Sequence, residues 1–454
     1  VSVSRRQPGW SEQDPAHWWH ACLAALARLR DSQPQAWRRI ACVGVSGQMH
    51  GAVMLDGAGQ VLYPAILWDD SRAVAQAAQL NRDYPHYAEV TGSLAMAGLT
   101  APKLLWMRQQ EPELFARIDC VLSPKDYLRL LLTGQRVSDM SDAAGTLWLD
   151  VARREWYEPM LHATGLTLEH MPTLLEANQR CGTLTREAAA QLGLPVGLPV
   201  AAGGGDNPVS AVAIGAIQAG DTFVTLGTSA AIVAITDRPA GNPAQAVHSF
   251  CHALPQRWYT MGAMLAGASC LRWVTRLLGQ PDEQTLLELV RLGLPVDRPV
   301  PISSPVFLPY LAGERTPHNN PNASASFHGL RRNHDLGDLS QAVMEGVAFA
   351  LLDSKLAINA SGVEFDRVWM AGGGSQSRAW LNIIAAVTGV TLQLPKAGAQ
   401  GAALGAARLA MLASGHRQED VLKVPQLAES IELDPALSES YKQRFSAFRD
   451  AYKP

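Results

Sequence analysis

The segment Leu198-Pro-Val-Ala-Ala-Gly-Gly-Gly-Asp-Asn-Pro208 leads from an apolar run of strand length into a glycine turn and then toward a helix. The run at 198–202 has the all-apolar character of a strand that is buried on both faces. Small residues from Val209 to Ile217 predict a closely packed helix after the turn. Such a strand–turn–helix unit is typical of α/β proteins, whose ligands bind at the carboxyl ends of strands.

Two further apolar runs end in turns that contain glycine. Residues 40–45 lead into Ser46-Gly-Gln-Met-His-Gly51, and we expect a buried strand at 40–45. Residues 368–371 lead into three glycines, after which the pattern at 378–387 predicts a helix. Strands therefore alternate with helices along the chain, and the fold class that we expect is α/β.

A β-hairpin and a domain boundary are predicted in the middle of the chain. Residues 221–226 and 230–235 are two strand-like runs on either side of Gly227-Thr-Ser229, the pattern of a tight hairpin. Gln218-Ala-Gly220 separates this hairpin from the preceding helix. Because 454 residues exceed one ordinary core, we expect two domains, 1–217 and 218–454.

The composition is that of a globular protein with 47% hydrophobic and 17% charged residues. A formal net charge of -3 and the lack of a basic tract interleaved with aromatic residues argue against nucleic acid as a partner. No run is long and apolar enough to span a bilayer, and no signal peptide is evident, so a membrane partner is not expected. The six cysteines are scattered and form no CxxC pair, which indicates reduced thiols in a cytoplasmic protein.

Three glycine-rich turns, at 203–205, 227–229 and 372–374, could each bring backbone N–H groups close to a phosphate. A P-loop is excluded because the chain has no Gly-Lys pair. Ser377 stands where a dinucleotide-binding G-x-G-x-x-G motif needs glycine, and no G-x-S-x-G elbow of a hydrolase is present. Any one of these turns could need its glycines only for the backbone geometry of the loop, whereas three such turns together favour a nucleotide-binding protein.

Asp206 is the most informative single residue, because it follows three glycines at the carboxyl end of the strand at 198–202. A carboxylate at this place can accept a proton from a substrate hydroxyl or help to hold Mg²⁺. It can equally cap a helix that has Pro208 at its first position. The residues alone leave both interpretations open.

His248, Cys251 and His252 form an H-x-x-C-H cluster that resembles a metal-binding pattern. No second group of cysteine or histidine completes it, so a zinc site is not favoured. His50, taken by itself, would be an ordinary loop histidine.

Taken together, these segments resemble the FGGY family of carbohydrate kinases, which share a two-domain, actin-like (ribonuclease H-like) ATPase fold. The resemblance covers the chain from Trp10 onward. Gly98-Leu-Thr-Ala-Pro-Lys-Leu-Leu-Trp-Met107 and Gly372-Gly-Gly-Ser-Gln-Ser-Arg-Ala-Trp380 are similar to the two family signatures. Four other segments resemble their counterparts in the members that act on D-xylulose: Gly47-Gln-Met-His-Gly51, Leu67-Trp-Asp-Asp-Ser-Arg72, Ser138-Asp-Met-Ser-Asp-Ala-Ala144 and Gly313-Glu-Arg-Thr-Pro-His318.

The resemblance implies phosphorylation of D-xylulose by ATP with Mg²⁺, in pentose catabolism. It makes Asp206 the general base, a metal-binding residue and part of the sugar site. The sugar-binding residues that it implies are Met49, His50, Asp206 and Asn207. The ATP-binding residues that it implies are Gly227, Thr228, Ser229, Gly313, Gly373 and Ser377. Residues 1–217 would then bind the sugar and 218–454 ATP; a homodimer is left open.

The beginning of the chain departs from the family pattern. Members of the family open with a β-hairpin that has an Asp-x-Gly-Thr-type turn, and this sequence starts just downstream of it. We therefore expect the first-domain hairpin to be missing, leaving a strand edge and apolar surface uncovered. We hypothesise that the chain is shortened and, as written, phosphorylates sugar poorly or not at all. Restoring a hairpin without any gain in turnover or thermal stability would contradict it.

Three other functions remain as alternatives at this stage. A kinase of the same family for ribulose, fuculose or a similar sugar is the nearest one. A regulator that binds nucleotide without turnover is the second, and it would bind ADP or sugar tightly without forming product. An NAD-dependent dehydrogenase is the most distant, and it requires binding of a nicotinamide cofactor.

Overall fold

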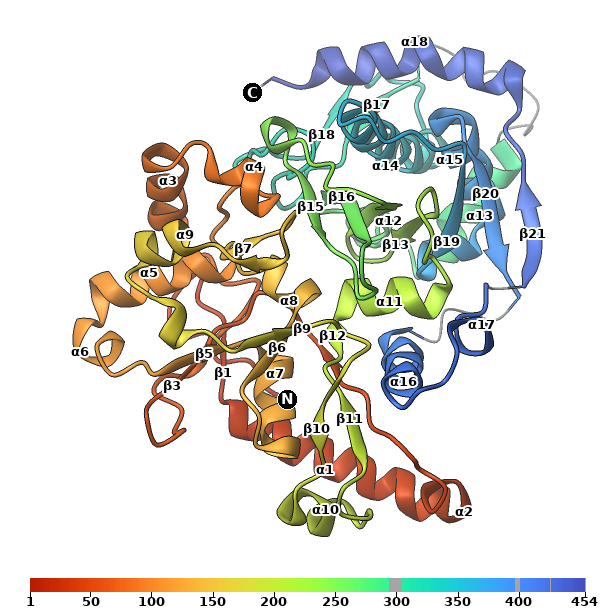
Figure 1. The fold of residues 1–454 in the computed structure, drawn as a ribbon. Coiled ribbons are helices and arrows are strands. Elements are labelled where there is room, and N and C mark those ends of the chain that lie inside the picture. Colours follow the sequence, from red (N-terminus) through yellow and green to blue (C-terminus); the bar gives the residue numbers. More distant parts are fainter. Residues whose placement is uncertain (294–303, 397–400, 425, 454) are drawn as a thin grey trace.

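The computed structural model describes residues 1–293, 304–396, 401–424 and 426–453. Figure 1 shows the first half of the sequence (red to yellow) to the left and below, and the second half (green to blue) mostly above and to the right. Helices and strands alternate in both halves. The predicted α/β class is therefore confirmed.

A seven-stranded mixed sheet forms the centre of the second half, in the order β15-β16-β14-β13-β19-β20-β21. β13, β19 and β20 run parallel, and the other neighbours pair antiparallel. The strands of this half, including the separate pair β17–β18, are β13 (Thr222–Leu226), β14 (Ala230–Thr236), β15 (Val247–Cys251), β16 (Trp258–Met264), β17 (Val306–Leu308), β18 (Ser326–His328), β19 (Arg367–Ala371), β20 (Thr391–Pro395) and β21 (Leu427–Ile431). β13 and β14 confirm the predicted hairpin.

The helices of the second half are α12 (Ser269–Leu277), α13 (Glu283–Gly293), α14 (Leu336–Asn359), α15 (Arg378–Thr388), α16 (Gly401–Ala413), α17 (Gln418–Val421) and α18 (Pro435–Ala451), with 3-10 turns η2 (Pro243–Gln245) and η3 (Gly373–Gln376). α14 is the longest, and Asp335 starts it with a reciprocal capping box to Asp338. Most of its residues are buried against the sheet and the neighbouring helices.

The two faces of the seven-stranded sheet are covered by different parts of the chain. Successive residues of a strand point to opposite faces. Val224 packs in a core with Phe349 of α14 and Trp380 of α15. Its neighbour Phe223 packs instead with Ala211, which belongs to the first half. The sheet therefore lies between its own helices and elements of the first half.

The first half contains short strands that pair two by two: β1–β4, β2–β12, β3–β5, β6–β9, β7–β8 and β10–β11. Their bounds are β1 (Glu12–Gln13), β2 (Ser46–Gly47), β3 (Val53–Leu55), β4 (Ala65–Ile66), β5 (Cys120–Leu122), β6 (Val137–Asp139), β7 (Leu149–Asp150), β8 (Glu155–Trp156), β9 (Thr173–Leu175), β10 (Arg180–Thr183), β11 (Pro199–Ala201) and β12 (Gly204–Gly205). β2 and β12 run parallel, which places the segments after residues 47 and 205 at the same edge.

The helices of the first half surround these strands. They are α1 (Pro15–Ser32), α2 (Pro34–Trp37), α3 (Val74–Asp83), α4 (Tyr87–Thr91), α5 (Thr100–Gln110), α6 (Pro112–Phe115), α7 (Pro124–Thr133), α8 (Met140–Ala144), α9 (Glu158–Thr164), α10 (Arg186–Leu192) and α11 (Asp206–Ile214), with the 3-10 turn η1 (Leu168–His170). Asp14 and Ser123 cap α1 and α7 by accepting hydrogen bonds from the first turn. α11 begins three residues earlier than the pattern predicts.

The prediction of a buried strand at 40–45 is wrong. Only a single bridge, between Val43 and Val200, forms in this segment, and most of its residues are half-buried. Val43 is hydrogen-bonded to Pro199 and Ala201 on one side, and within the described ranges no strand pairs with its other side. An apolar run becomes a central strand only where neighbours satisfy both of its edges.

Helix α16 belongs to the second half of the sequence but packs on the first. It contacts α11, β11 and β2, and Figure 1 shows it beside α11. Glycines allow this approach, because a Cβ at Gly405 would lie 2.0 Å from the carbonyl oxygen of Val209. A Cβ at Gly44 would likewise lie 2.0 Å from the carbonyl oxygen of Ala406. The two halves are thus joined by close backbone contact at this helix.

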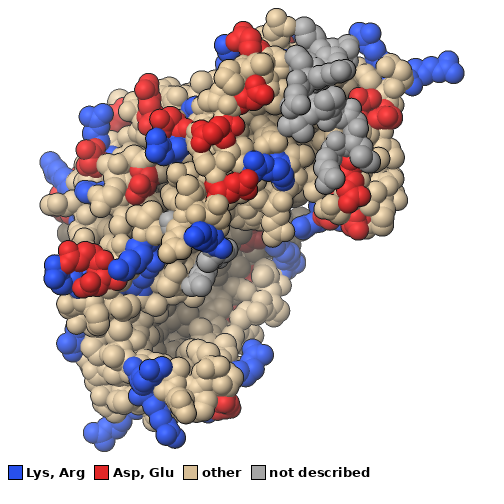
Figure 2. All heavy atoms as spheres, turned by 90° about the vertical axis from the view of Figure 1, so that its right-hand side faces the viewer, with Lys and Arg blue, Asp and Glu red and all other residues tan. Residues whose placement is uncertain are grey.

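The surface carries both signs of charge. Figure 2 shows Lys, Arg, Asp and Glu interspersed over one face, with a hollow low on that face where few charged side chains lie. None of the helices in the described ranges has both the length and the hydropathy that crossing a membrane requires.

Candidate active site

Asp206 is the first residue of α11 and follows β12 directly. Gly205, not Asp206, is the N-cap, and Pro208 is the third helical residue, so the interpretation of Asp206 as a helix cap is wrong. The reason is the earlier start of the helix. The carboxylate of Asp206 is half-buried, and it accepts a hydrogen bond from the backbone N–H of Asn207 at 2.8 Å. Burial raises the pKa of the Asp206 carboxyl, which makes it a better proton acceptor when ionised.

Met49 lies against the turn that carries Asp206. A Cβ at Gly205 would lie 2.5 Å from Met49 Cγ and 2.7 Å from Sδ, so any larger residue there would displace the Met49 side chain. Met49 is buried, and the hydroxyl of Tyr259 on β16 points to its sulfur at 4.0 Å. Burial raises the pKa of Tyr259 well above its usual range, with Asp206 a further cause, so this hydroxyl keeps its proton. The structure thus brings two of the predicted sugar-binding residues to one place, while Asn207 is exposed beside them.

His50 has a left-handed backbone conformation with φ 68°, which is uncommon outside glycine. Its Nδ1 lies 2.8 Å from the carbonyl oxygen of Gly145, the residue after α8. Burial lowers the pKa of His50 to about 3, so the ring is neutral and its Nδ1 donates to that oxygen. The other ring nitrogen, Nε2, is then an acceptor that could meet a sugar hydroxyl.

Lys103 of α5 holds the His50 segment in this conformation. Its buried ammonium group donates to the carbonyl oxygens of His50 at 2.8 Å and of Gly98 at 2.9 Å. Burial lowers its pKa to about 7. Sequence reasoning did not single out Lys103, although it lies inside the quoted segment 98–107, because its partner His50 is far away in the chain.

A separate cavity of about 730 Å³ lies in the second half. Four of the predicted ATP-binding residues line it: Gly227, Thr228, Gly373 and Ser377. The first turn of α15 lines it too, and a helix N-terminus favours an anion. Ser377 caps α15 by accepting a hydrogen bond from the N–H of Trp380 at 3.3 Å. The arrangement suits a nucleotide that places its phosphates near the 227–229 turn.

Ser229 and Gly313 do not line this cavity. Ser229 is exposed at the tip of the hairpin, next to Thr228. Gly313 has φ +77°, and a Cβ there would lie 2.6 Å from the carbonyl oxygen of Pro321, so glycine is required for the turn itself. A nucleotide contact for these two residues stays a prediction.

Glu314 is hydrogen-bonded to the segment that contacts the 227–229 turn. One of its carboxylate oxygens accepts hydrogen bonds from the N–H groups of Leu265 at 3.1 Å and Arg315 at 2.7 Å. Two residues beyond Leu265, the N–H of Gly267 donates to the carbonyl oxygen of Thr228 at 2.9 Å. Burial raises the pKa of Glu314 to about 7.

The three side chains of the H-x-x-C-H cluster are buried in the core and contact other protein groups. His248 Nδ1 lies 2.7 Å from the hydroxyl of Ser93, and His252 Nδ1 accepts a hydrogen bond from the N–H of Leu254 at 3.0 Å. Cys251 Sγ faces the carbonyl oxygen of Val151 at 3.6 Å. Each of the three side chains has a protein partner at one atom.

Comparisons with known proteins agree along the whole chain. Residues 1–213 match the N-terminal domain of the FGGY family of carbohydrate kinases, and residues 222–414 match its C-terminal domain. A xylulose kinase of Escherichia coli (strain K12) is 44% identical over 455 residues, covering 100% of this chain and 92% of the relative. The crystal structure of a xyloylose kinase from Brucella ovis has a TM-score of 0.94 at 44% identity, covering 100% of this chain and 92% of that one. A xylulose kinase structure from Rhodospirillum rubrum has a TM-score of 0.91 at 30% identity, with the same coverage.

Proposed function

The chain belongs to the FGGY family of carbohydrate kinases, and we propose that it transfers the γ-phosphoryl group of ATP to the terminal hydroxyl of D-xylulose. It is an enzyme that phosphorylates a sugar with ATP. The observation that carries the choice of site is the contact of Met49 with Gly205, because it joins the sugar segment to the turn that bears Asp206. D-Xylulose is the substrate supported by two xylulose kinases that are each 44% identical, one over 100% and the other over 91% of this chain.

In the proposed reaction Asp206 accepts the proton of the sugar's terminal hydroxyl. The sugar oxygen then forms a bond to the γ-phosphorus of ATP as the bond to the β-phosphate oxygen breaks, giving D-xylulose 5-phosphate and ADP. Positioning and electrostatic stabilisation supply most of the catalysis in such transfers. The neutral ring of His50 orients a sugar hydroxyl, and Asn207 lies at the edge of the same site.

Mg²⁺ fits the residues that are present. The Asp206 carboxylate offers hard oxygen atoms and has one described side-chain hydrogen bond, so it retains lone pairs for a ligand. We therefore propose that Asp206 would help to hold a magnesium ion that arrives with ATP. Such an ion neutralises charge on the β- and γ-phosphates.

The nucleotide is assigned to the cavity beside α15. Gly227, Thr228 and Ser229 are proposed to contact the phosphates through their backbone, and Gly373, Ser377 and Gly313 to lie along the adenosine. In this arrangement residues 1–217 bind the sugar and residues 218–454 bind ATP. Closure of the two halves around the substrates would exclude water as a competing acceptor.

We propose a cytoplasmic location, because ATP is available there and all six cysteines are free thiols. A homodimer stays a prediction that light scattering at several protein concentrations would test.

The test is ADP release with Mg-ATP and a panel of ketoses that includes D-xylulose, ribulose and fuculose. We expect the highest kcat/KM for D-xylulose. Asp206→Asn should lower kcat by roughly 10²- to 10⁴-fold, the usual contribution of a general base. Asp237→Asn removes an exposed carboxylate elsewhere in the second half and should leave kcat unchanged.

Other outcomes separate the alternatives. A higher kcat/KM for ribulose or fuculose would change the substrate but keep the kinase. Tight binding of ADP or sugar without product, measured by calorimetry, would favour a regulator.

A further inference from the structure

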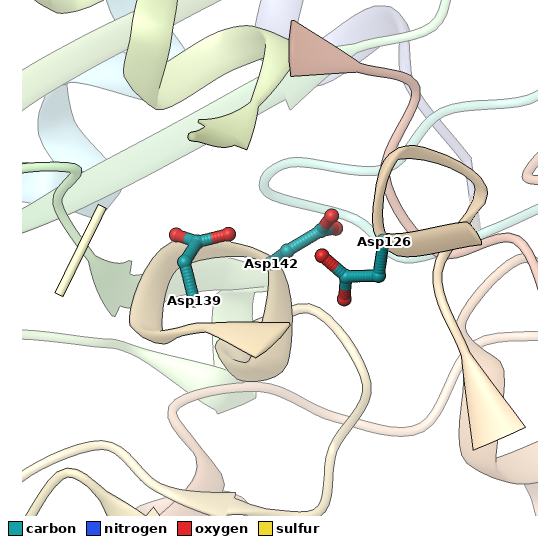
Figure 3. Close-up of side chains that lie close together, drawn as sticks. All are labelled: Asp126, Asp139 and Asp142. Carbon is teal, nitrogen blue, oxygen red and sulfur yellow. The ribbon is translucent and has the colours of Figure 1, made fainter. Parts of the chain in front are cut away.

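A cluster of buried charges lies next to the turn at 203–205. The ammonium group of Lys125 lies 2.5 Å from Asp126, 2.8 Å from Asp139 and 3.7 Å from Asp142. Figure 3 shows the three carboxylates, which come from α7 (Asp126), the end of β6 (Asp139) and α8 (Asp142). They lie close enough together to hold a metal ion, but Lys125 already supplies the positive charge. Burial raises the pKa of Asp142 well above its usual range, and Lys125 and Arg129 both form ion pairs with Asp126.

The cluster reaches the downstream end of the turn through Ser141. Asp139 accepts hydrogen bonds from the N–H of Ser141 at 2.8 Å and from its hydroxyl at 2.5 Å. Because the hydroxyl proton points to Asp139, the lone pairs of the Ser141 oxygen are available to another donor. That donor is the N–H of Gly205 at 3.2 Å, one residue before Asp206.

The same cluster holds the upstream end of the turn. The carbonyl oxygen of Ala202 accepts a hydrogen bond from the guanidinium of Arg129 and a longer one, 3.5 Å, from Lys125. Between the two ends, a Cβ at Gly204 would lie 3.0 Å from the Ser141 hydroxyl, so the turn packs directly on this serine. A turn of three glycines has little stiffness of its own, and these contacts fix its path.

Helix α8, which contains Ser141, also reaches the sugar segment. The carbonyl oxygen of Gly145, at its carboxyl end, accepts from His50, and a Cβ at Gly145 would lie 3.0 Å from Met49 Cε. One short helix therefore contacts the segment of Met49 at one end and the turn of Asp206 at the other. Its placement sets the separation between the two.

From this geometry we infer that Ser141 is a positioning residue for Asp206. Its hydroxyl, oriented by Asp139, fixes the N–H of Gly205 and thereby the direction in which the Asp206 carboxylate leaves the turn. The inference rests on the proposed role of Asp206 as the base. It adds a residue that touches neither substrate but determines where the base stands.

The experiment measures the position of Asp206 in two independent ways. The first is the pKa of its carboxyl, from the ¹³C resonance of carboxyl-labelled aspartate, assigned by its absence in Asp206→Asn. In Ser141→Ala the turn relaxes and solvent reaches the carboxylate, so this pKa falls toward its ordinary value. The second is kinetics, in which kcat for D-xylulose falls by roughly 10- to 100-fold while KM for ATP is unchanged.

Two control variants separate positioning from packing. Ser141→Cys fills the same space with a weak hydrogen-bond acceptor, so it should behave like Ser141→Ala in kcat but unfold at a higher temperature. Ser123→Ala removes another buried hydroxyl of the cluster, which donates to Asp142 at 2.6 Å and, among the described residues, has no hydrogen bond to the turn. It should lower the unfolding temperature and leave both kcat and the pKa of Asp206 as they are.

The outcomes are distinguishable. If Asp206→Asn keeps full kcat, the proposed base is wrong, whatever Ser141 does. If Asp206→Asn abolishes turnover but Ser141→Ala changes neither the Asp206 pKa nor kcat, the positioning role is overturned. If Ser141→Cys restores kcat, the role is packing and the inference is likewise overturned. The NMR measurement reads out the position of Asp206 even in protein that has no turnover.

Discussion

The sugar side and the nucleotide side of the site are built from different kinds of contact. Met49 and Gly205 are buried, and they meet although they are far apart in the chain. Gly373 and Thr228 are exposed in turns that line an open cavity, although the N–H of Gly267, from a distant segment, donates to the carbonyl oxygen of Thr228. A fixed, enclosed surface can discriminate between hydroxyl patterns, because a mismatched polar group is left without a partner. An open cavity of backbone N–H groups can hold phosphate while permitting exchange of ATP for ADP.

The strongest test of this difference between the two sides is to add one methyl group to a glycine on each of them. Gly205→Ala would push Met49 aside, so we expect a loss of about 1–3 kcal/mol in the free energy of unfolding. kcat/KM for D-xylulose should fall by roughly 10²-fold, because the sugar segment and the base no longer keep their separation. Denaturant unfolding and steady-state kinetics measure both.

Gly373→Ala is the matched variant on the nucleotide side. No heavy atom lies within 4 Å of its added Cβ, so the unfolding free energy should be preserved and any kinetic change confined to KM for ATP. An equal fall in kcat/KM for D-xylulose in the two variants would show that the two sides do not differ in this way.

The second prediction concerns the support of His50. Lys103→Met keeps the length of the side chain but removes the ammonium donor from the carbonyl oxygens of Gly98 and His50, the second of which keeps only the hydroxyl of Thr100, and this costs about 1–3 kcal/mol of stability. KM for D-xylulose should rise and KM for ATP should not. Lys442→Met, at an exposed lysine of α18, is the control and should change neither. A rise in KM for ATP alone would contradict the role assigned to Lys103.

The third prediction concerns Glu314, on the nucleotide side, and the pH dependence of stability. Burial raises its pKa from 4.5 to about 7, so the folded state holds a proton that the unfolded chain releases in this window. The stability that this proton contributes is present below pH 4.5 and is lost as pH rises through about 7. The melting temperature of the wild type relative to Glu314→Gln should therefore fall between about pH 5 and pH 7. A difference that stays constant with pH would mean that Glu314 is already ionised when folded.

The same contrast explains what could be predicted from the sequence. The hairpin at 222–236 and the glycine turn before α15 follow from local patterns, and the structure confirms them. The strand at 40–45 was not predictable, because a strand depends on neighbours that the run itself does not specify. Lys103 and Ser141 were missed for a similar reason, since their partners lie in distant segments. Local patterns predicted the hairpin and the turn before α15, whereas Lys103 and Ser141 act through tertiary contacts.

Helix α16 has a consequence for the order in which the protein is made. Its residues 401–413 fit against Gly44 and Val209, yet they are synthesised long after both. The first half therefore cannot complete its packing on the ribosome while only its own residues have emerged. Its exposed apolar surface is covered late, and a chaperone that shields nascent chains would act during that interval.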